Sequence, residues 1–317
     1  MKWQLDLDIP SPSRLIRHDE SLILLGSCFT NSIGGYLQDH YFDALANPAG
    51  IMFDAFSIVR QLKRMINNQQ VELAELKKED ELYFHWDFHG SFADVNPETA
   101  LASMNKAVEK GREALLNANH VLITLGTAYS YFYLPEDRSV ANCHKVPAKQ
   151  FDKRLMSSYD IEDALKEGIE AVREVHPEVQ FVFTVSPVRH YRDGIIENNR
   201  SKARLLEAVH SVVESSLDVY YFPAYELVID VLRDYRFYDI DLVHPNYAAT
   251  EYVFERFCAA CLEAKTQQNL PEFKQLNLGR NHRALHPETK AHQKFLQQLK
   301  RRETELITRF PYLNNRL

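Results

Sequence analysis

Residues 22–33 read LILLGSCFTNSI, and this stretch organises the rest of the chain. Four apolar residues closed by Gly26 predict a short buried strand of the kind found in parallel sheets. From Phe29 onward the apolar residues recur at helical spacing, so a helix is expected to follow. The small residues 26–28 therefore lie on a sharp turn between a strand and a helix.

This turn places the hydroxyl of Ser27 where an open α/β sheet has its binding sites, at the carboxyl ends of the strands. N–H groups of the helix start are available there too, because the first turn of a helix leaves them without acceptors. A serine in this position also has a simpler interpretation, in which it only caps the helix. The rest of the chain decides between a nucleophile and a cap.

Length and composition restrict the classes of protein. At 317 residues the chain can bury a large core, as one big α/β domain or as two smaller ones. A formal charge of −7 gives no electrostatic footprint for nucleic acid, and no apolar run reaches the ~20 residues of a membrane span. Apolar and acidic residues alternate within the first eight residues, which lack the apolar core of a signal peptide, so no secretion signal is predicted. Four cysteines without metal spacing predict reduced thiols in a cytoplasmic protein.

Buried strands alternate with helices along the chain, which predicts an α/β fold with a doubly wound parallel sheet. Strands are expected at residues 22–25, 120–125, 180–185 and 219–222. Helices are expected at about residues 55–65, 97–117, 149–175, 197–217, 225–234, 247–264 and 289–308. A hairpin insertion is expected where residues 129–134 and 140–143 flank a Pro-Glu-Asp-Arg turn.

The chain divides into a large and a small part. Residues 1–265 are predicted to form the α/β domain. Residues 266–317 are polar and end in a basic amphipathic helix, which we expect to pack on the domain or on a partner. A homo-oligomer is therefore left open.

A second motif supplies what a nucleophilic serine needs, namely a base and a group that orients the base. Asp241 and His244 have D-x-x-H spacing on one expected loop, so the carboxylate can reach Nδ1 of the imidazole while Nε2 faces outward. The chain order Ser27, Asp241, His244 is one of several that converge on triad geometry. Such a pair alone is a weak signal, because capping and surface pairs also produce it. Opposite a serine on a strand turn, it predicts a catalytic triad.

The residues 26–30, Gly-Ser-Cys-Phe-Thr, resemble the name motif of the GSCFA family, with threonine where the last alanine usually stands. Further stretches resemble that family: NPAGI at 47–51, ITLGT at 123–127, ANCHK at 141–145, SPVRH at 186–190 and DLVHP at 241–245. The family is grouped with the SGNH hydrolases, which include GDSL-like esterases. The resemblance therefore implies a three-layer α/β/α flavodoxin-like fold and a hydrolase activity.

The resemblance also implies roles for single residues. Ser27 matches the nucleophile, and Asp241 with His244 matches the last motif of the superfamily. Gly50 best matches the glycine whose N–H serves the oxyanion hole. The asparagine of the third motif is missing here, and Asn142 on the neighbouring hairpin is the expected substitute.

The remaining candidates each have a structural interpretation beside the functional one. Gly50 could only permit a turn with positive φ, and Asn142 could cap a strand end. His144 is a candidate for substrate binding, although a structural role is favoured, and with its neighbouring cysteine it offers too few ligands for a metal. Arg189 and His190 follow a strand end, where they could hold an anionic substrate group or form a solvated salt-bridging pair.

Together these residues predict a serine esterase or deacetylase that hydrolyses an ester of a small acylated molecule, carbohydrate esters included. Ser27 attacks, His244 is the general base and then acid, and Asp241 orients the imidazole. No metal, organic cofactor, nucleic acid or membrane partner is expected. Two alternatives stay open: acyl transfer to a sugar or alcohol acceptor in a dry cleft, and non-catalytic ligand binding at a decayed site.

Overall fold

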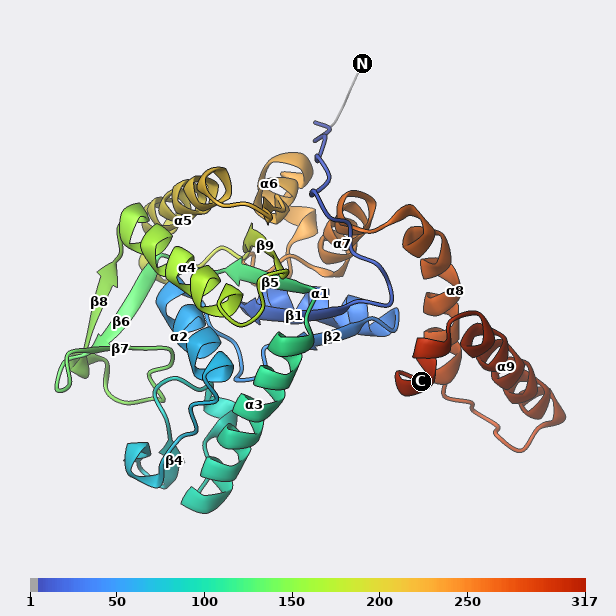
Figure 1. Cartoon of the computed structure of the whole chain (residues 1–317), viewed down its shortest axis with the longest axis horizontal. Helices are drawn as coiled ribbons and strands as arrows, with labels where there is room; N and C mark the ends of the chain where they lie inside the picture. Colours follow the sequence, from blue (N-terminus) through green and yellow to red (C-terminus); the bar gives the residue numbers. More distant parts are fainter. Residues whose placement is uncertain (1–4) are drawn as a thin grey trace.

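The computed structural model describes residues 5–317; residues 1–4, part of the N-terminal stretch considered above, lie outside the described residues. Within that range, five parallel strands form the central sheet: β1 (Ser21–Gly26), β2 (Asp43–Ala46), β5 (His120–Leu125), β9 (Gln180–Val185) and β10 (Val219–Tyr221). Their spatial order, β2-β1-β5-β9-β10, is the flavodoxin-like order 2-1-3-4-5, so the predicted α/β fold is confirmed. Figure 1 shows β2, β1, β5 and β9 side by side in this order. The order reverses between β1 and β5, and open α/β sheets bind ligands outside the strand ends at such a point.

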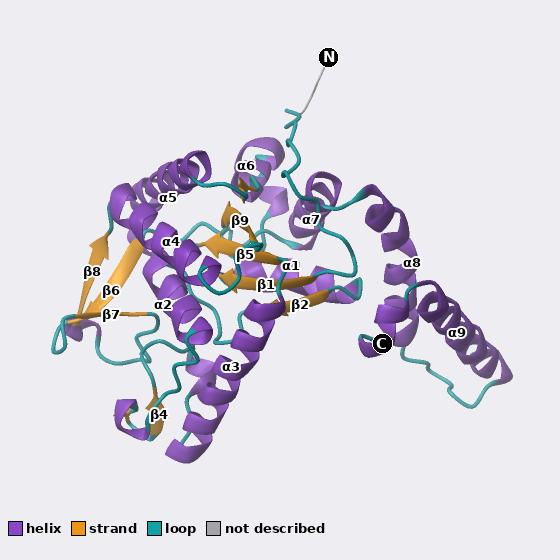
Figure 2. Cartoon of the chain, viewed as in Figure 1, coloured by secondary structure: helices purple, strands orange, loops and turns teal. Residues whose placement is uncertain are grey.

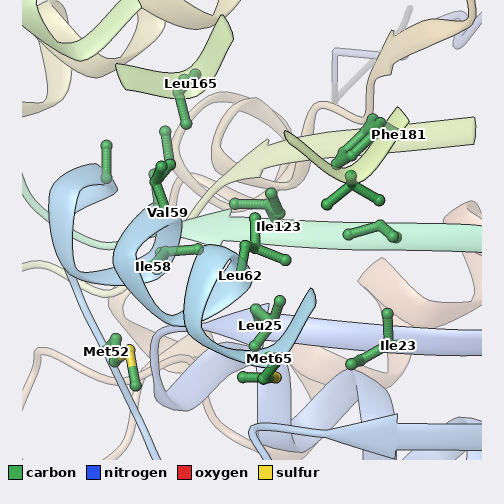
Figure 3. Close-up of a cluster of buried hydrophobic side chains, with 14 of the residues drawn as sticks. Ile23, Leu25, Met52, Ile58, Val59, Leu62, Met65, Ile123, Leu165 and Phe181 are labelled. Atoms are coloured by element: carbon green, nitrogen blue, oxygen red, sulfur yellow. The ribbon is translucent and has the colours of Figure 1, made fainter. Parts of the chain in front are cut away.

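Alternating side chains along β1 give the sheet two apolar faces. Ile23 and Leu25 face one layer of helices, whereas Leu22 and Leu24 face the other. The first layer contains α2 (Ala55–Ile66), α3 (Pro97–Asn117), α4 (Ser158–Arg173) and α5 (Ile195–Ser215). The second contains α1 (Cys28–Asp39), α6 (Ala224–Glu226) with its π-helical continuation η5 (Leu227–Leu232), and α7 (Tyr247–Cys261). Figure 3 shows the first layer in contact with the sheet, where side chains of α2 and α4 lie over β1, β5 and β9.

The insertion beside the sheet contains the predicted hairpin and one strand that was not predicted. The sequence predicts a helix from residue 149, but the structure has a strand, β8 (Phe151–Leu155), which pairs with β6 (Tyr129–Tyr133). With β7 (Arg138–Val140) these strands form an antiparallel sheet in the order β7-β6-β8. Helix α4 begins only after Ser157, whose side chain forms a reciprocal capping box with Asp160. Pairing with β6 therefore overrides the helical composition of this stretch.

Residues 69–80 are polar and charged, which predicts an exposed connection, and residues 83–89 alternate aromatic with polar side chains, which predicts a strand or hairpin edge. The structure has a small hairpin here, formed by β3 (Lys77–Glu79) and β4 (Leu82–Phe84). The aromatic run that follows does not continue as a strand, and Trp86 packs in a separate apolar cluster with residues of the insertion. The cluster gives the insertion a core of its own.

The C-terminal arm contains α8 (Ala264–Arg280) and α9 (Lys290–Arg309). Helix α9 lies close to the predicted bounds, but α8 was not predicted, because it is polar and contains Pro271. Phe273 of α8 packs in a small cluster with Tyr41 and with residues of α9, and its ring stacks on His18 at 4.3 Å. Figure 2 shows the arm at the opposite end of the molecule from the β6–β8 sheet. The boundary at residue 265 remains a prediction.

Candidate active site

Contacts with β5 fix the turn that follows β1. Gly26 has a φ of +137°, and a Cβ at this position would lie 2.1 Å from the carbonyl oxygen of Thr124. Ser27 donates its N–H to the same carbonyl at 3.1 Å. Helix α1 begins at the next residue, Cys28. The strand, turn and helix predicted for residues 22–33 are confirmed.

The side chain of Ser27 does not cap α1. Its hydroxyl makes no capping hydrogen bond, so the simpler interpretation of this serine does not hold. The residue is fully buried, and its Oγ has no hydrogen-bond partner in the described part of the chain. Leaving a buried hydroxyl unpaired costs about 1–3 kcal/mol. Neither capping nor packing therefore accounts for a serine at this position.

Residues 47–53 cover the turn. A side-chain oxygen of Asn47 accepts the N–H of Gly26 at 2.8 Å, and the N–H of Met52 donates to the carbonyl of the same glycine at 3.0 Å. The carbonyl of Phe53 then accepts two N–H groups just after β5, at 2.8 and 3.0 Å. The covering segment thus runs across the carboxyl ends of β1 and β5. In this arrangement the serine hydroxyl is closed off from solvent.

The loop before α7 holds Asp241 and His244 as a pair. Oδ1 of Asp241 accepts the N–H groups of Val243 and His244 at 2.9 and 3.0 Å, and Oδ2 lies 2.6 Å from Nδ1 of His244. The hydrogen bonds from the backbone and ring of His244 lower the pKa of Asp241 to about 2, so this side chain is a carboxylate at neutral pH. Both side chains are nearly half exposed. Because Nδ1 is engaged by the carboxylate, Nε2 is the ring nitrogen left for another partner.

The loop lies at the same edge of the sheet as the serine. The N–H of Arg189, after β9, donates to the carbonyl of Val243 at 3.2 Å. Strands β1, β5 and β9 are parallel, so their carboxyl ends share one edge. No hydrogen bond within residues 5–317 joins Oγ of Ser27 to His244. The structure therefore brings Asp241 and His244 together and leaves the serine apart from them, and the triad remains a prediction.

Gly50 does not have the free N–H that the oxyanion assignment requires. Its N–H donates to the carbonyl of Asn47 at 2.8 Å within a tight turn. Its φ is +89°, and a Cβ there would lie 2.1 Å from Cβ of His89. The structure supports the conformational interpretation of this glycine, and in this arrangement its N–H is not free to bind an oxyanion.

Asn142 borders a cavity of about 380 Å³ between the insertion sheet and the carboxyl ends of the central strands. Its Oδ1 accepts the N–H of His144 at 2.9 Å, and among the described residues its Nδ2 has no hydrogen-bond partner. The amide N–H groups are therefore available to a ligand. Polar and aromatic side chains line the same cavity, among them Thr127, Tyr129, Tyr131, Lys153 and His190.

The structure separates the three candidate substrate-binding residues. His190 lines the cavity, with its ring edge-on to Phe53 at 5.6 Å, and burial lowers its pKa to about 4. His144 instead stacks on Phe84 at 4.2 Å and lies 3.0 Å from the carbonyl of His85 through Nε2, so it is part of the core of the insertion. Its predicted contact with substrate is not supported.

Arg189 does not line the cavity, and it forms no ion pair with a described carboxylate. One guanidinium nitrogen donates to the side chain of Asn199 at 3.3 Å, and the group lies over the ring of Tyr191 at 5.3 Å. The salt-bridging pair is therefore not formed among the described residues, and binding of an anionic group by Arg189 stays a prediction. Arg189 instead contributes its backbone N–H to holding the loop of His244.

Three polar residues on the inner face of α5 hold the segments of the candidate site, and they were not predicted from the sequence. Asn198 accepts the N–H of His190 at 3.0 Å, and Oγ of Ser201 accepts the N–H of Ala128 at 2.8 Å. Lys202 donates to two backbone carbonyls at the ends of β5 and β9. The signal that could have revealed them is their spacing of i, i+3 and i+4, which places three polar side chains on the buried face of a helix.

Residues 21–257 match the GSCFA family. This chain belongs to the GSCFA family. Residues 273–316 match the C-terminal domain of GSCFA domain proteins, and no curated protein sequence matches the chain. The family assignment confirms the resemblance of the quoted motifs.

Solved structures similar to this GSCFA chain include three carbohydrate esterases. A carbohydrate esterase family 3 structure from Talaromyces cellulolyticus shares 9% identity, covers 80% of this chain and 99% of its own, and has a TM-score of 0.37. A family two carbohydrate esterase from Clostridium thermocellum, in complex with cellohexaose, shares 14% sequence identity and has a TM-score of 0.37. The match covers 78% of this chain and 64% of the esterase. The acetyl xylan esterase Est2A from Butyrivibrio proteoclasticus shares 11% sequence identity and has a TM-score of 0.37. The match covers 80% of this chain and 66% of Est2A. Likeness at this level identifies neither a substrate nor an activity.

Each letter of the GSCFA motif has a place in the structure. The glycine permits close contact with β5, and the serine carries the unpaired hydroxyl. Cys28 begins α1, and burial raises the pKa of its thiol, so it is protonated at neutral pH. Phe29 packs in the core between α1 and the sheet. Thr30, which replaces the usual alanine, donates its N–H to the carbonyl of Ser27 at 2.9 Å.

Two further observations concern the whole described part of this GSCFA chain. Residues 5–317 contain no cluster of three or more His, Cys, Asp or Glu side chains that could hold a metal ion. Over the same residues, no helix has both the length and the apolar character needed to cross a membrane. All four cysteines are free thiols.

Proposed function

We propose that this GSCFA protein is a serine esterase or deacetylase of the SGNH type, acting on a small acylated molecule. One observation carries the proposal: the paired Asp241 and His244 lie at the same sheet edge as the unpaired hydroxyl of Ser27. The cavity beside this edge has tyrosine side chains among polar ones, which suits a hydroxylated ligand such as an acylated carbohydrate.

In the proposed reaction, Oγ of Ser27 attacks the ester carbonyl while its proton passes to Nε2 of His244. Asp241 holds Nδ1 and stabilises the imidazolium, because it is ionised at neutral pH. The tetrahedral intermediate then expels the alcohol, which takes the proton from His244, and leaves an acyl ester on Ser27. Water attacks this ester by the same route and releases the acid.

Of the two oxyanion donors expected from the sequence, Gly50 and Asn142, only Asn142 has a free N–H in this arrangement. The N–H groups of both Gly50 and Ser27 are engaged by backbone carbonyls. Asn142 offers its amide from the cavity wall, and the first turn of α1 has N–H groups without helical acceptors. We assign the oxyanion to these two sources.

Access to Ser27 requires part of its cover to move. The rings of Phe53 and His190 meet edge-on, and both residues line the cavity. Phe53 also belongs to the segment that crosses the ends of β1 and β5. We therefore propose that the substrate enters from the cavity and displaces this pair of rings.

The test combines covalent labelling with hydrolysis. The wild-type protein should react with a fluorophosphonate at Ser27 and hydrolyse p-nitrophenyl acetate, because a histidine-activated serine does both. Ser27→Ala should do neither. Ser32→Ala, on the same helix but outside the site, should behave as wild type. A folded wild-type protein that shows neither labelling nor turnover would instead be a binding module.

Burial of the serine also favours a second candidate, acyl transfer to an alcohol, because a site closed to water protects the acyl-enzyme from hydrolysis. The two reactions share the same residues and differ only in the acceptor. Turnover of an acetyl ester with and without a sugar or glycerol acceptor separates them. If more acetylated acceptor than acetate is formed, the protein is a transferase.

A further inference from the structure

Lys202 places a positive charge inside the molecule, at the edge of the sheet that carries the candidate site. Its side chain is 1% exposed, and Nζ donates to the carbonyls of Gly126 and Ser186, both at 2.7 Å. These two residues directly follow β5 and β9. No described carboxylate pairs with the lysine. A buried ammonium without a carboxylate is costly, and the reaction proposed above makes no use of it.

The surroundings of Lys202 include the start of α1. Cys28, next to the serine in sequence, is near enough to Lys202 that the ammonium opposes the rise in the pKa of the thiol, although burial outweighs this effect. Arg189 and His190 face the lysine from the segment after β9, and the ring of Tyr225 lies 5.9 Å away. The charge therefore lies among the carboxyl ends of β1, β5 and β9.

Attack on an ester creates negative charge on the carbonyl oxygen beside Ser27. Hydrogen-bond donors for this oxygen are few, because the third-motif asparagine is missing and the N–H of Gly50 is engaged. A fixed positive charge in a water-excluded region stabilises developing negative charge far more strongly than it would in water. Lys202 offers such a charge at the ends of β5 and β9.

We propose that the ammonium of Lys202 is a positioning residue for acyl transfer at Ser27: it ties the ends of β5 and β9 together, and its charge stabilises the anionic tetrahedral intermediate. This inference rests on the proposed function. The lysine gives up no proton during turnover, so the proton still passes between Ser27, His244 and the leaving group.

The proposal predicts a loss of kcat at alkaline pH. Burial lowers the pKa of Lys202 to about 7, so the charge disappears as the pH rises through this value. The neighbouring groups keep their states between pH 6.5 and 8.5. Burial lowers the pKa of His190 to about 4 and raises the pKa values of Cys28 and Tyr225.

The experiment compares three proteins on p-nitrophenyl acetate across this range. In the wild type, kcat should fall at least fivefold between pH 6.5 and 8.5. Lys202→Met should lower kcat about 10²-fold at pH 6.5, leave KM within threefold, and remove the alkaline fall. Ser201→Ala removes an uncharged contact of the same helix face but keeps the charge, so its alkaline fall should persist. If Lys202 had only a structural role, kcat would depend on pH in the same way in both variants.

The proposal is overturned if folded Lys202→Met keeps kcat within threefold of the wild type, or if its alkaline fall persists. If circular dichroism shows that this variant does not fold, the wild type still provides the test. Its rate of phosphonylation at Ser27 should then fall over the same pH range, and a flat profile overturns the proposal. A wild type that is neither labelled nor active at any pH refutes the proposed function itself, whereas the other negative results refute only the role of Lys202.

Discussion

The two halves of the candidate site are built in different ways. The half around Ser27 is buried and is held by contacts between residues far apart in the sequence, because its neighbours belong to β5 and to residues 47–53. The half around His244 is exposed and is held mostly by its own loop, since Asp241 bonds only to residues two and three positions away. The first half depends on the fold, and the second depends on local sequence.

This difference means that the two halves should respond differently to substitution. Changes in the buried half should alter the free energy of unfolding together with activity. Changes in the exposed loop should alter activity alone, because its side chains are solvated and bury little apolar surface. Measuring turnover and stability for each variant tests whether the contrast holds.

Ser27→Ala should have the largest effect. Hydrolysis of p-nitrophenyl acetate should fall by at least about 10³-fold, because the nucleophile is lost. The free energy of unfolding should not decrease, and should rise by up to about 1 kcal/mol, since an unpaired buried hydroxyl is removed. Chemical denaturation measures this change. Retained activity would point to Cys28 as the nucleophile and overturn the mechanism.

Asp241→Asn should follow, with a fall in kcat of about 10²–10⁴-fold, because an amide no longer holds the required tautomer of His244. Thermal unfolding should be almost unchanged, since both side chains are half exposed. A large loss of stability in this variant would contradict the contrast between the two halves.

Asn142→Ala should have a smaller effect on the rate, about 10²-fold in kcat, if its amide binds the oxyanion from the cavity wall. The melting temperature should change little. Full activity in this variant would assign the oxyanion to backbone N–H groups alone.

Cys28→Ala should retain most of its activity, because the cysteine starts α1 and its raised pKa keeps the thiol protonated. The small cavity should cost on the order of 1 kcal/mol of stability. Treatment of the wild type with iodoacetamide should leave activity largely intact. Inactivation by this reagent together with an inactive Cys28→Ala variant would indicate a thiol enzyme.

The smallest expected effect is a change in the stability of the folded protein in mild acid. The pKa of His190 is about 4 in the folded protein, below its usual 6.5, so the unfolded chain binds more protons between these values and stability falls as the pH falls. Asp241 stays ionised over this range, because its pKa is about 2. His190→Gln should therefore reduce the loss of stability between pH 6.5 and 4, by on the order of 1 kcal/mol. If His190→Gln loses as much stability as the wild type between pH 6.5 and 4, then His190 binds its proton as readily in the folded protein as in the unfolded chain.

The same contrast explains what could be predicted from the sequence. Four strands of the central sheet, the turn at residues 26–28 and the pairing of Asp241 with His244 follow from patterns a few residues long, whereas β2 was not predicted. The hydrogen bond that engages the N–H of Gly50 could not be predicted, because it depends on how the turn from Asn47 folds. Strand β8 was missed because its partner, β6, lies about 20 residues earlier in the chain.

The polar face of α5 was not predictable for a related reason. A buried lysine can be interpreted only when the groups around its Nζ are known, and here they are carbonyls after two different strands. The sequence shows the spacing of Asn198, Ser201 and Lys202, but it does not show which surface that helix face meets.

Gly26 has a consequence for sequence variation. Any side chain here would meet the backbone of β5, which cannot move aside without separating two paired strands, and the positive φ disfavours every other residue as well. In a saturation library screened only for soluble expression, position 26 should therefore tolerate nothing but glycine, while position 27 should accept alanine. The glycine and the serine of the motif would then be required for different reasons, Gly26 for folding and Ser27 for chemistry.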